Sequence, residues 1–304
     1  MRPGPPWVRA GLMLVGVSIA SRAQAAPITF LTALPVAQGK YVWREQLLWR
    51  RDTRDPTPMQ RAMQAWGVGT AFAYGATPKF TVFVAAPLMD KRLDLTLPTG
   101  MRITRRARGL GDAMAFGRYT FLHRDGAGYT LRGAWFVGAQ MPTGRDHASD
   151  AFGRLPPPLQ LGTGAWDPLT GVTFTYQTLD YEFDMDASEL VSTEAQGYRS
   201  GDLAELDASL QVRLLPRQLG AGLPHFLYGV LEANLLEQGH DRQQGVIDPN
   251  SGGTTLFLSP GLQVVTPDWI WEASVQVPVA QHLHGSAVKN NFILWAGFQR
   301  NFGA

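Results

Sequence analysis

The chain has 304 residues, with 27 Lys and Arg, 25 Asp and Glu, 33 Gly, 9 Trp, 15 Phe and 8 Tyr, and it has no cysteine. A chain without cysteine has no disulfides, no zinc–thiolate site and no thiol nucleophile. Three arginines and no acidic residue fall within residues 1–25, so 24 basic and 25 acidic groups remain beyond them. This balance excludes a basic surface typical of nucleic-acid binding.

Residues 1–25 have the pattern of a secretory signal peptide. Arg2 and Arg9 supply the positive charge, residues 10–20 form a short apolar stretch, and Ala23 and Ala25 fit the small-residue cleavage motif. The apolar stretch is shorter than the roughly 20 residues that a membrane helix needs. We therefore expect cleavage after Ala25 and export of the mature chain.

The next segment, residues 26–39, is mostly apolar and precedes the first predicted strand. Two interpretations of this N-terminal segment stay open. It either tucks into the interior of the protein as a small plug, which we favour, or adds a partial strand.

Apolar and polar residues then alternate along most of the chain. In residues 269–280, for example, Trp269, Trp271 and Val275 share one face of an extended segment, while Glu272 and Gln276 share the other. In a helix these polar side chains would be spread around the axis, whereas in a strand they lie on one side. The period of two therefore predicts strands that are apolar on one face and polar on the other.

About twelve such segments follow one another, and many have nearly the 9–11 residues that a tilted membrane strand needs. Strands that span a membrane close into a ring, because an open sheet edge would leave backbone groups unpaired in hydrocarbon. We therefore predict an all-β protein, a transmembrane antiparallel β-barrel of about 12 strands (range 10–14) formed by residues 40–304. The predicted strands are 40–51, 64–75, 79–88, 110–124, 128–141, 165–177, 181–191, 203–215, 225–237, 254–265, 269–280 and 288–302.

The connections between these segments alternate in length. The long ones are 52–63, 89–109, 142–164, 192–202 and 238–253, and the short ones include 76–78, 125–127, 178–180 and 266–268. Outer-membrane barrels have long extracellular loops and short periplasmic turns. Two connections depart from this order, because 216–224 is long for a turn and 281–287 is short for a loop. A secreted β-sandwich is the alternative fold.

Aromatic residues gather near the ends of the predicted strands, where a barrel has its interfacial girdles. The candidates are Trp43, Trp49, Trp66, Trp269, Trp271 and Trp295. The last strand also places apolar residues, from Phe292 to Phe302, on one face, as a barrel-assembly signal does. Gly303 and Ala304 follow where that signal normally ends on the aromatic residue itself.

Charged residues on the polar faces of the strands are expected to line the interior of the barrel, because a charge that faces lipid costs several kcal/mol near the midplane. The first strand contributes either Glu45 or Arg44. These interior side chains form either a polar conduit or a closed, ion-paired filling. The other candidates are Arg118, Arg132, Glu182, Asp184, Asp186, Glu205, Asp207, Arg213, Glu232 and Glu272.

A group of arginines falls in the predicted loop 89–109. Arg102, Arg105, Arg106 and Arg108 are candidates for contact with lipopolysaccharide phosphates, since guanidinium groups bind phosphate well. A solvated basic loop without a partner is the alternative interpretation.

The sequence gives little support for catalysis or metal binding. No serine lies in a G-x-S-x-G motif, and His225 reaches Ser209 only if the two lie on adjacent strands. His282 and His284 lie in a predicted loop without a carboxylate next to them, and residues 248–253 lack the spaced acids of a calcium loop. We expect no enzyme, no metal and no cofactor, with a lipid hydrolase that uses His225 or His123 as the least favoured hypothesis.

A series of short motifs resembles a known outer-membrane family. They are Gly109-Leu110-Gly111-Asp112, Met141-Pro142-Thr143-Gly144, Leu161-Gly162-Thr163-Gly164-Ala165-Trp166-Asp167, Leu231-Glu232-Ala233-Asn234 and Leu258-Ser259-Pro260-Gly261-Leu262. In this order they resemble the "putative meta-pathway of phenol degradation" family over most of residues 40–302. The resemblance implies a transporter that is distantly similar to fatty acid and aromatic-hydrocarbon channels of the outer membrane, and it carries over no catalytic residue.

These observations predict a protein of the bacterial outer membrane that takes up small hydrophobic or aromatic molecules. The expected partners are outer-membrane lipid and lipopolysaccharide, a small-molecule solute and the barrel-assembly machinery. The alternative function is a structural or envelope-interaction barrel whose loops 89–109 and 142–164 bind partners or lipopolysaccharide.

Overall fold

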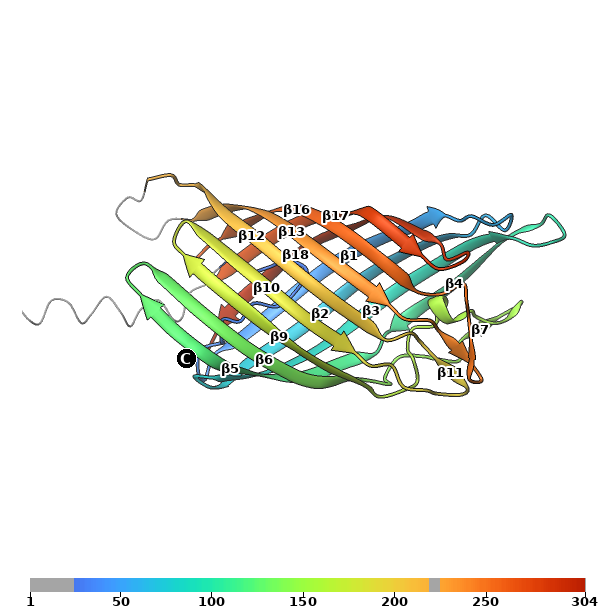
Figure 1. The fold of residues 1–304 in the computed structure, drawn as a ribbon, viewed down its shortest axis with the longest axis horizontal. Coiled ribbons are helices and arrows are strands. Elements are labelled where there is room, and N and C mark those ends of the chain that lie inside the picture. Colours follow the sequence, from blue (N-terminus) through green and yellow to red (C-terminus); the bar gives the residue numbers. More distant parts are fainter. Residues whose placement is uncertain (1–24, 219–224, 304) are drawn as a thin grey trace, which may run out of the picture.

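A computed structural model describes residues 25–218 and 225–303, and within them the chain forms one closed antiparallel barrel (Figure 1). The first strand, β1, pairs with both β2 and β18, which closes the ring. The barrel strands are β1 (Tyr41–Arg54), β2 (Ala62–Thr77), β3 (Phe80–Thr96), β5 (Ala113–Gly126), β6 (Tyr129–Met141), β9 (Asp167–Thr178), β10 (Tyr181–Leu190), β12 (Leu203–Leu215), β13 (Phe226–Gln238), β16 (Gly253–Val265), β17 (Trp269–Leu283) and β18 (Lys289–Phe302).

The structure confirms the predicted fold class and strand number. Every predicted strand segment overlaps one barrel strand, and neighbouring barrel strands pair antiparallel. Burial follows the predicted period of two. On β10, for instance, Glu182 is 1% exposed and the next residue, Phe183, is 40% exposed. The barrel is therefore apolar outside and polar inside, as a membrane-spanning barrel requires.

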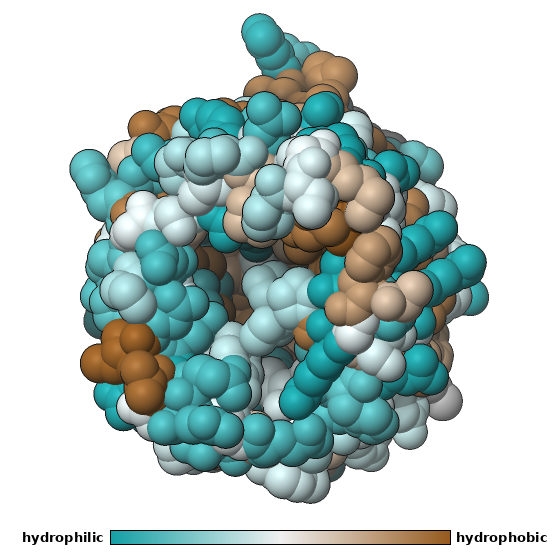
Figure 2. All heavy atoms as spheres, turned by 90° about the vertical axis from the view of Figure 1, so that its right-hand side faces the viewer, coloured by the Kyte–Doolittle hydropathy of each residue, from teal (hydrophilic) through white to brown (hydrophobic). Residues whose placement is uncertain are grey.

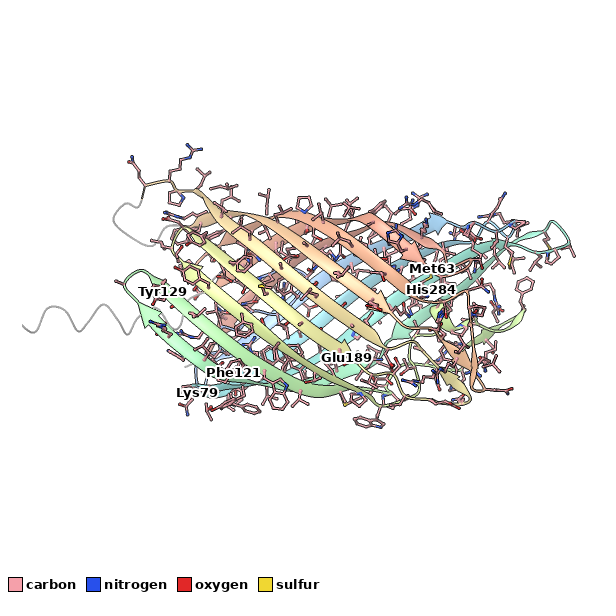
Figure 3. All side chains as sticks on the ribbon, viewed as in Figure 1. Met63, Lys79, Phe121, Tyr129, Glu189 and His284 are labelled. Carbon is pink, nitrogen blue, oxygen red and sulfur yellow. The ribbon has the colours of Figure 1, made fainter. Side chains whose placement is uncertain are left out.

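The two ends of the barrel differ as the loop lengths predicted. Lys79 and Tyr129 lie near short turns at one end, whereas Met63 and His284 lie at the opposite end, where the long connections gather (Figure 3). Of the connection 216–224, residues 219–224 lie outside the described part of the chain, as do residues 1–24 of the expected signal peptide. In the described residues, no helix is long and apolar enough to cross a membrane.

The long connections carry small elements of their own. These are β7 (Ser149–Asp150), β8 (Gly153–Arg154) and the 3₁₀ helix η2 (Pro157–Leu159) between β6 and β9, β11 (Tyr198–Arg199) between β10 and β12, and β14 (Arg242–Gln243) with β15 (Val246–Ile247) between β13 and β16. The elements β11, β14 and β15 form a three-stranded sheet. At the end with the long loops, hydrophilic residues ring a hollow mouth (Figure 2).

The prediction that residues 89–109 form a loop is wrong. Strand β3 continues to Thr96, and residues 102–110 form a further strand, β4 (Arg102–Leu110), which pairs with its outer half. This hairpin extends beyond the rest of the barrel wall (Figure 1). Its outward side chains are charged because they lie above the hydrocarbon. The alternation with apolar residues outside and polar residues inside, which identifies a membrane strand, is therefore missing there.

Aromatic side chains form two belts on the outside of the barrel. Trp49 stacks on Trp66 at a centroid distance of 5.0 Å toward the long-loop end, and Trp269 stacks on Trp271 at 5.7 Å toward the other. Trp295 is an exception among the predicted girdle residues. It lies on the inward face of β18, and its indole donates to Gln276 Oε1 inside the barrel at 3.2 Å.

Candidate functional site: the barrel interior and an interruption of its wall

The N-terminal segment 25–39 lies inside the barrel. Ile28 and Ala33 are almost completely buried, although neither belongs to a strand. The Ile28 amide donates to Glu232 Oε1 at 2.6 Å, and the Thr29 hydroxyl donates to the other oxygen of the same carboxylate at 2.7 Å. One wall side chain thus binds two successive residues of the segment.

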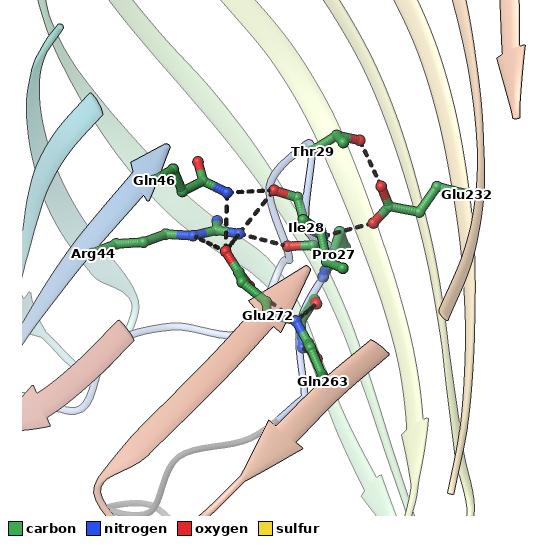
Figure 4. A network of polar contacts seen from close by, with 9 residues as sticks. Pro27, Ile28, Thr29, Arg44, Gln46, Glu232, Gln263 and Glu272 are labelled. Atoms are coloured by element: carbon green, nitrogen blue, oxygen red, sulfur yellow. Dashed lines mark hydrogen bonds and ion pairs between the residues drawn. The ribbon is translucent and has the colours of Figure 1, made fainter. Parts of the chain in front are cut away.

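Arg44 on β1 binds the same part of the segment from the opposite wall (Figure 4). Its guanidinium donates to the carbonyl oxygens of Pro27 and Ile28 at 3.1 and 2.8 Å and forms an ion pair with Glu272 on β17 at 2.7 Å. The Gln46 amide also donates to the Ile28 carbonyl, at 2.7 Å. A bridge of side chains therefore crosses the interior through the segment.

The later residues of the segment bind the wall in the same way. The hydroxyls of Thr32 and Thr175 are 2.9 Å apart, and the Ala33 amide donates to Thr175 Oγ1 at 2.8 Å. Arg118 donates to the carbonyls of Thr32 and Leu34. A backbone without a strand partner needs hydrogen bonds from side chains when it is buried. The polar wall supplies them.

The ten charged residues that the sequence analysis assigned to the interior lie on inward-facing positions of their strands. Arg118, Glu232 and Glu272 belong to the network around the segment, while Asp186 and Asp207 are direct partners in the β10–β12 register. Arg132 and Arg213 pair with Asp125 and Asp180 at the short-turn end. The remaining three, Glu182, Asp184 and Glu205, occupy the inward positions of β10 and β12.

Of the two alternatives on the first strand, Arg44 faces the interior and Glu45 faces outward. The outward carboxylate accepts hydrogen bonds from the Trp43 indole at 2.9 Å and from the Thr70 hydroxyl at 3.0 Å. Sequence reasoning missed the uncharged partners of the segment, among them Gln46 and Thr175. Their only signal is their position on the polar side of the period of two.

The barrel wall is interrupted between β4 and β5. Gly111 and Asp112 separate the two strands. Among residues 25–218 and 225–303, β4 pairs with β3 only, so no described strand lies beside its other edge. The connection from β6 to β9 covers that edge. Leu155, Leu159 and Leu161 of this connection pack against Ala107 on β4 and against Met89 and Leu93 on β3.

Asp112 binds the β6–β9 connection at the point where β4 and β5 are separated. Its carboxylate accepts hydrogen bonds from the Gly144 amide at 2.8 Å and from the Thr163 amide at 2.7 Å. A Cβ atom at Gly144 would lie within 2.9 Å of backbone atoms of Gly111, Leu161 and Gly162, so only glycine allows this close approach. The first three motifs of the family resemblance thus meet at one place, although they are far apart in the sequence.

Two cavities flank this seal, the contact between the β6–β9 connection and the edge of β4. One, of about 540 Å³, lies inside the mouth and is lined by Met89, Lys91, Asp112, Gln160 and Tyr198 among others. The other, of about 340 Å³, includes the outward-facing Arg108 and Leu110. Leu161 lines both cavities and is 7% exposed. Leu161 is therefore the residue that the linings of the two cavities share.

The four arginines predicted to contact lipopolysaccharide do not all face the same side of β4. Arg102, Arg106 and Arg108 are exposed on the outward face of β4, and they lie on a strand where the sequence analysis expected a loop. Arg105 points the other way, because neighbouring residues of a strand face opposite sides. Its guanidinium binds Asp150 on β7 at 2.7 Å, so it is turned away from the lipid-facing surface.

The histidines form no catalytic or metal-binding arrangement in residues 25–218 and 225–303, where no three metal-binding side chains cluster. Ser209 on β12 lies beside Glu232 of β13. His225 directly precedes β13 at the end of the barrel, so the strand register does not place it beside Ser209. His123 binds Asp125 at 3.0 Å near a short turn. His284 stacks on His240 at a centroid distance of 4.2 Å, and His282 lies on β17.

Comparison with known proteins identifies relatives in sequence and in fold. A family profile described as "Putative MetA-pathway of phenol degradation" matches residues 70–282. Among solved structures, the COG4313 outer membrane channel from Pseudomonas putida F1 has a TM-score of 0.64 and 13% identity, over 92% of this chain and 100% of that one. The beta domain of the Bordetella autotransporter BrkA has a TM-score of 0.48 and 13% identity, over 87% and 100%. No curated protein sequence matches this chain.

Proposed function

This chain belongs to the family described as "Putative MetA-pathway of phenol degradation", and we propose that it is a channel of the bacterial outer membrane for small hydrophobic or aromatic molecules. The fold it shares with an outer membrane channel supports this location. The observation that carries the proposal is the position of Leu161 between a cavity in the mouth and a cavity on the outer surface.

The axis of the barrel is a poor route for such a solute. The N-terminal segment crosses the interior as a plug, and its wall partners are charged or strongly polar. An apolar molecule gains nothing from this surface and would have to displace its hydrogen bonds, each of which contributes about 0.5–1.5 kcal/mol. We propose instead that the solute collects in the mouth and leaves sideways past Leu161 into the membrane.

The seal at the wall interruption is suited to opening. The edge of β4 is covered by a connection rather than by a strand, so separating them breaks side-chain contacts and not a backbone ladder. The solute would move from the polar mouth toward hydrocarbon, which is favourable for an apolar molecule. Opening of this kind leaves the rest of the barrel closed.

A disulfide across the seal tests this route. We propose the double variant Asp112→Cys/Thr163→Cys, since the two side chains are in contact and the chain has no other cysteine. Oxidation is expected to reduce uptake of a labelled monoaromatic compound by cells or proteoliposomes, and reduction to restore it. Ion conductance through the barrel is expected to stay the same in both states.

The two single-cysteine variants serve as controls, because they carry the same substitutions without the cross-link. Uptake that is equal in the oxidised and reduced double variant would reject the sideways route. Absence of uptake by the unmodified protein, at every monoaromatic compound offered, would reject the channel function itself.

The structure also bears on the expected partners. We infer that lipid surrounds the apolar belts, that lipopolysaccharide contacts the long-loop end, and that the barrel-assembly machinery recognises the last strand, β18. The envelope-interaction function stays a second hypothesis. Loss of surface binding on shortening the hairpin 97–101, with uptake unchanged, would favour it.

A further inference from the structure

We propose that the outward faces of β1, β3 and β4 form a binding site for the phosphate groups of lipid A, the phosphorylated glycolipid of the outer leaflet. The proposal rests on the outer-membrane location inferred above but not on any route of transport. It assigns a ligand to arginines that the interior of the barrel does not use.

The outward residues of β3 and β4 change from apolar to charged at one level along the barrel axis. On β3, Val84 and Leu88 are exposed apolar residues, and the next outward positions hold Asp90, Arg92 and Asp94. On β4, Leu110 is 62% exposed, and the outward positions beyond it hold Arg108 and Arg106, with Arg102 nearer the tip. The hydrocarbon boundary therefore lies between Leu88 and Asp90 and between Leu110 and Arg108.

The strand register brings these residues into adjacent rows. In one row, Trp49, Trp66, Asp90 and Arg108 follow one another across four strands, and in the next row Arg51, Gln64, Arg92 and Arg106 do so. Neighbouring strands are about 4.8 Å apart, so each row spans roughly 15 Å. That width fits one glycolipid headgroup beside the stacked Trp49 and Trp66 of the aromatic belt.

The basic residues of this surface outnumber the acidic ones. Arg51, Arg92, Arg102, Arg106 and Arg108 face outward with Asp90 and Asp94 as the carboxylates among them. Arg106 binds Asp90, and Arg92 binds Asp94 at 3.1 Å. Arg51 and Arg108 form no ion pair within the described residues, which leaves two guanidinium groups free for an anion.

Lipid A matches both parts of this surface. Its phosphates lie at the boundary between its acyl chains and its saccharide, which is the level of Arg51 and Arg108. Guanidinium groups bind phosphate oxygens in pairs of parallel hydrogen bonds. Its acyl chains would pack on the exposed Leu47, Leu88 and Leu110 directly below. Free phosphate would gain only the first of these two contacts.

The test compares two double variants of equal charge in lipid nanodiscs. Arg51→Gln/Arg108→Gln removes two positive charges from the proposed site. Lys79→Gln/Arg124→Gln removes two exposed charges at the opposite, short-turn end. Retention of hexa-acylated lipid A is measured by native mass spectrometry, against the same lipid without its phosphates and against phosphatidylglycerol.

We expect the first variant to bind lipid A about 25-fold more weakly, because an arginine near an anionic lipid surface contributes about a factor of five, and the second variant to bind it normally. Equal binding by both variants, or equal retention of the dephosphorylated lipid, would overturn the proposal. Preferential retention of phosphatidylglycerol would also overturn it. Heat modifiability on gels shows that each variant is folded, and lipid A retention is measured without any transport assay. Failure here is therefore distinct from failure of the channel function.

Discussion

Asp112 and Thr163 lie 51 residues apart in the sequence and are joined by two hydrogen bonds, from the Thr163 amide at 2.7 Å and from its hydroxyl at 3.1 Å. Through these bonds Asp112, which ends the interruption between β4 and β5, holds the β6–β9 connection that covers the edge of β4. This contact is the clearest point at which the channel could be opened or locked, and it motivates the first prediction.

Replacing Asp112 by Ala is expected to loosen the seal without unfolding the barrel. The amides of Gly144 and Thr163 lose their acceptor, and an unsatisfied buried group costs about 1–3 kcal/mol. Hydrogen exchange at these two amides is expected to rise at least about tenfold, since 1.4 kcal/mol corresponds to a factor of ten. Asp268→Ala, at a short turn, is the control, and unchanged exchange at both amides would contradict the prediction.

Tethering the N-terminal segment is expected to reduce ion conductance. In the variant Thr32→Cys/Thr175→Cys, the new thiols replace hydroxyls that are 2.9 Å apart, so a disulfide can form where the segment meets β9. Planar-bilayer recordings are expected to show lower conductance after oxidation and recovery with reductant. Conductance that does not respond to reductant would mean that the segment does not move when ions pass.

Arg44→Ala is expected to free the first half of the segment. This side chain binds two carbonyls of the segment and the Glu272 carboxylate, and hydrogen bonds to charged groups contribute about 1.5–3 kcal/mol. The open fraction measured in single-channel recordings is expected to increase by about a factor of ten or more, because 1.4 kcal/mol is tenfold. Arg51→Ala, which faces outward on the same strand, is the matched control and is expected to leave it unchanged.

The interior is expected to select cations over anions. Seven of the ten interior residues identified from the sequence are carboxylates and three are arginines, two of which pair with acids at the short turns. Water-facing rings of acidic side chains favour cations. A reversal potential in a salt gradient measures this preference, and Asp186→Asn/Asp207→Asn is expected to weaken it. Anion selectivity in the unmodified protein would refute the prediction.

The small hairpin β7–β8 is expected to loosen as the pH falls. The hydrogen bond from Arg105 lowers the pKa of Asp150 below its ordinary value. A carboxyl group with a lowered pKa in the folded state contributes stability above its unfolded pKa and loses it as the pH falls through the folded value. Proteolysis near residues 150–154 is expected to increase below about pH 4, the ordinary Asp value. In Asp150→Asn this pH dependence should disappear.

Much of the barrel could be predicted because the membrane imposes a simple pattern. On β10 and β12, the alternation of apolar residues with Glu182, Asp184 and Asp207 predicts strands and also which face is inside. The pattern failed on the hairpin from Leu88 to Leu110. There the outward face carries charged residues and the inward face packs on leucines of the β6–β9 connection, so the apolar-outside pattern of a membrane strand is absent.

The sequence by itself determined the strand order, the polar interior and the alternation of turns and loops, because these follow from the period of two and from the need to close every sheet edge in hydrocarbon. Only the tertiary structure decided that Arg105 faces Asp150 while Arg106 faces outward, that segment 25–39 occupies the interior, and that Gly111, Gly144 and Gly162 meet at one point. Each of these depends on contacts between residues far apart in the chain, which no local pattern encodes.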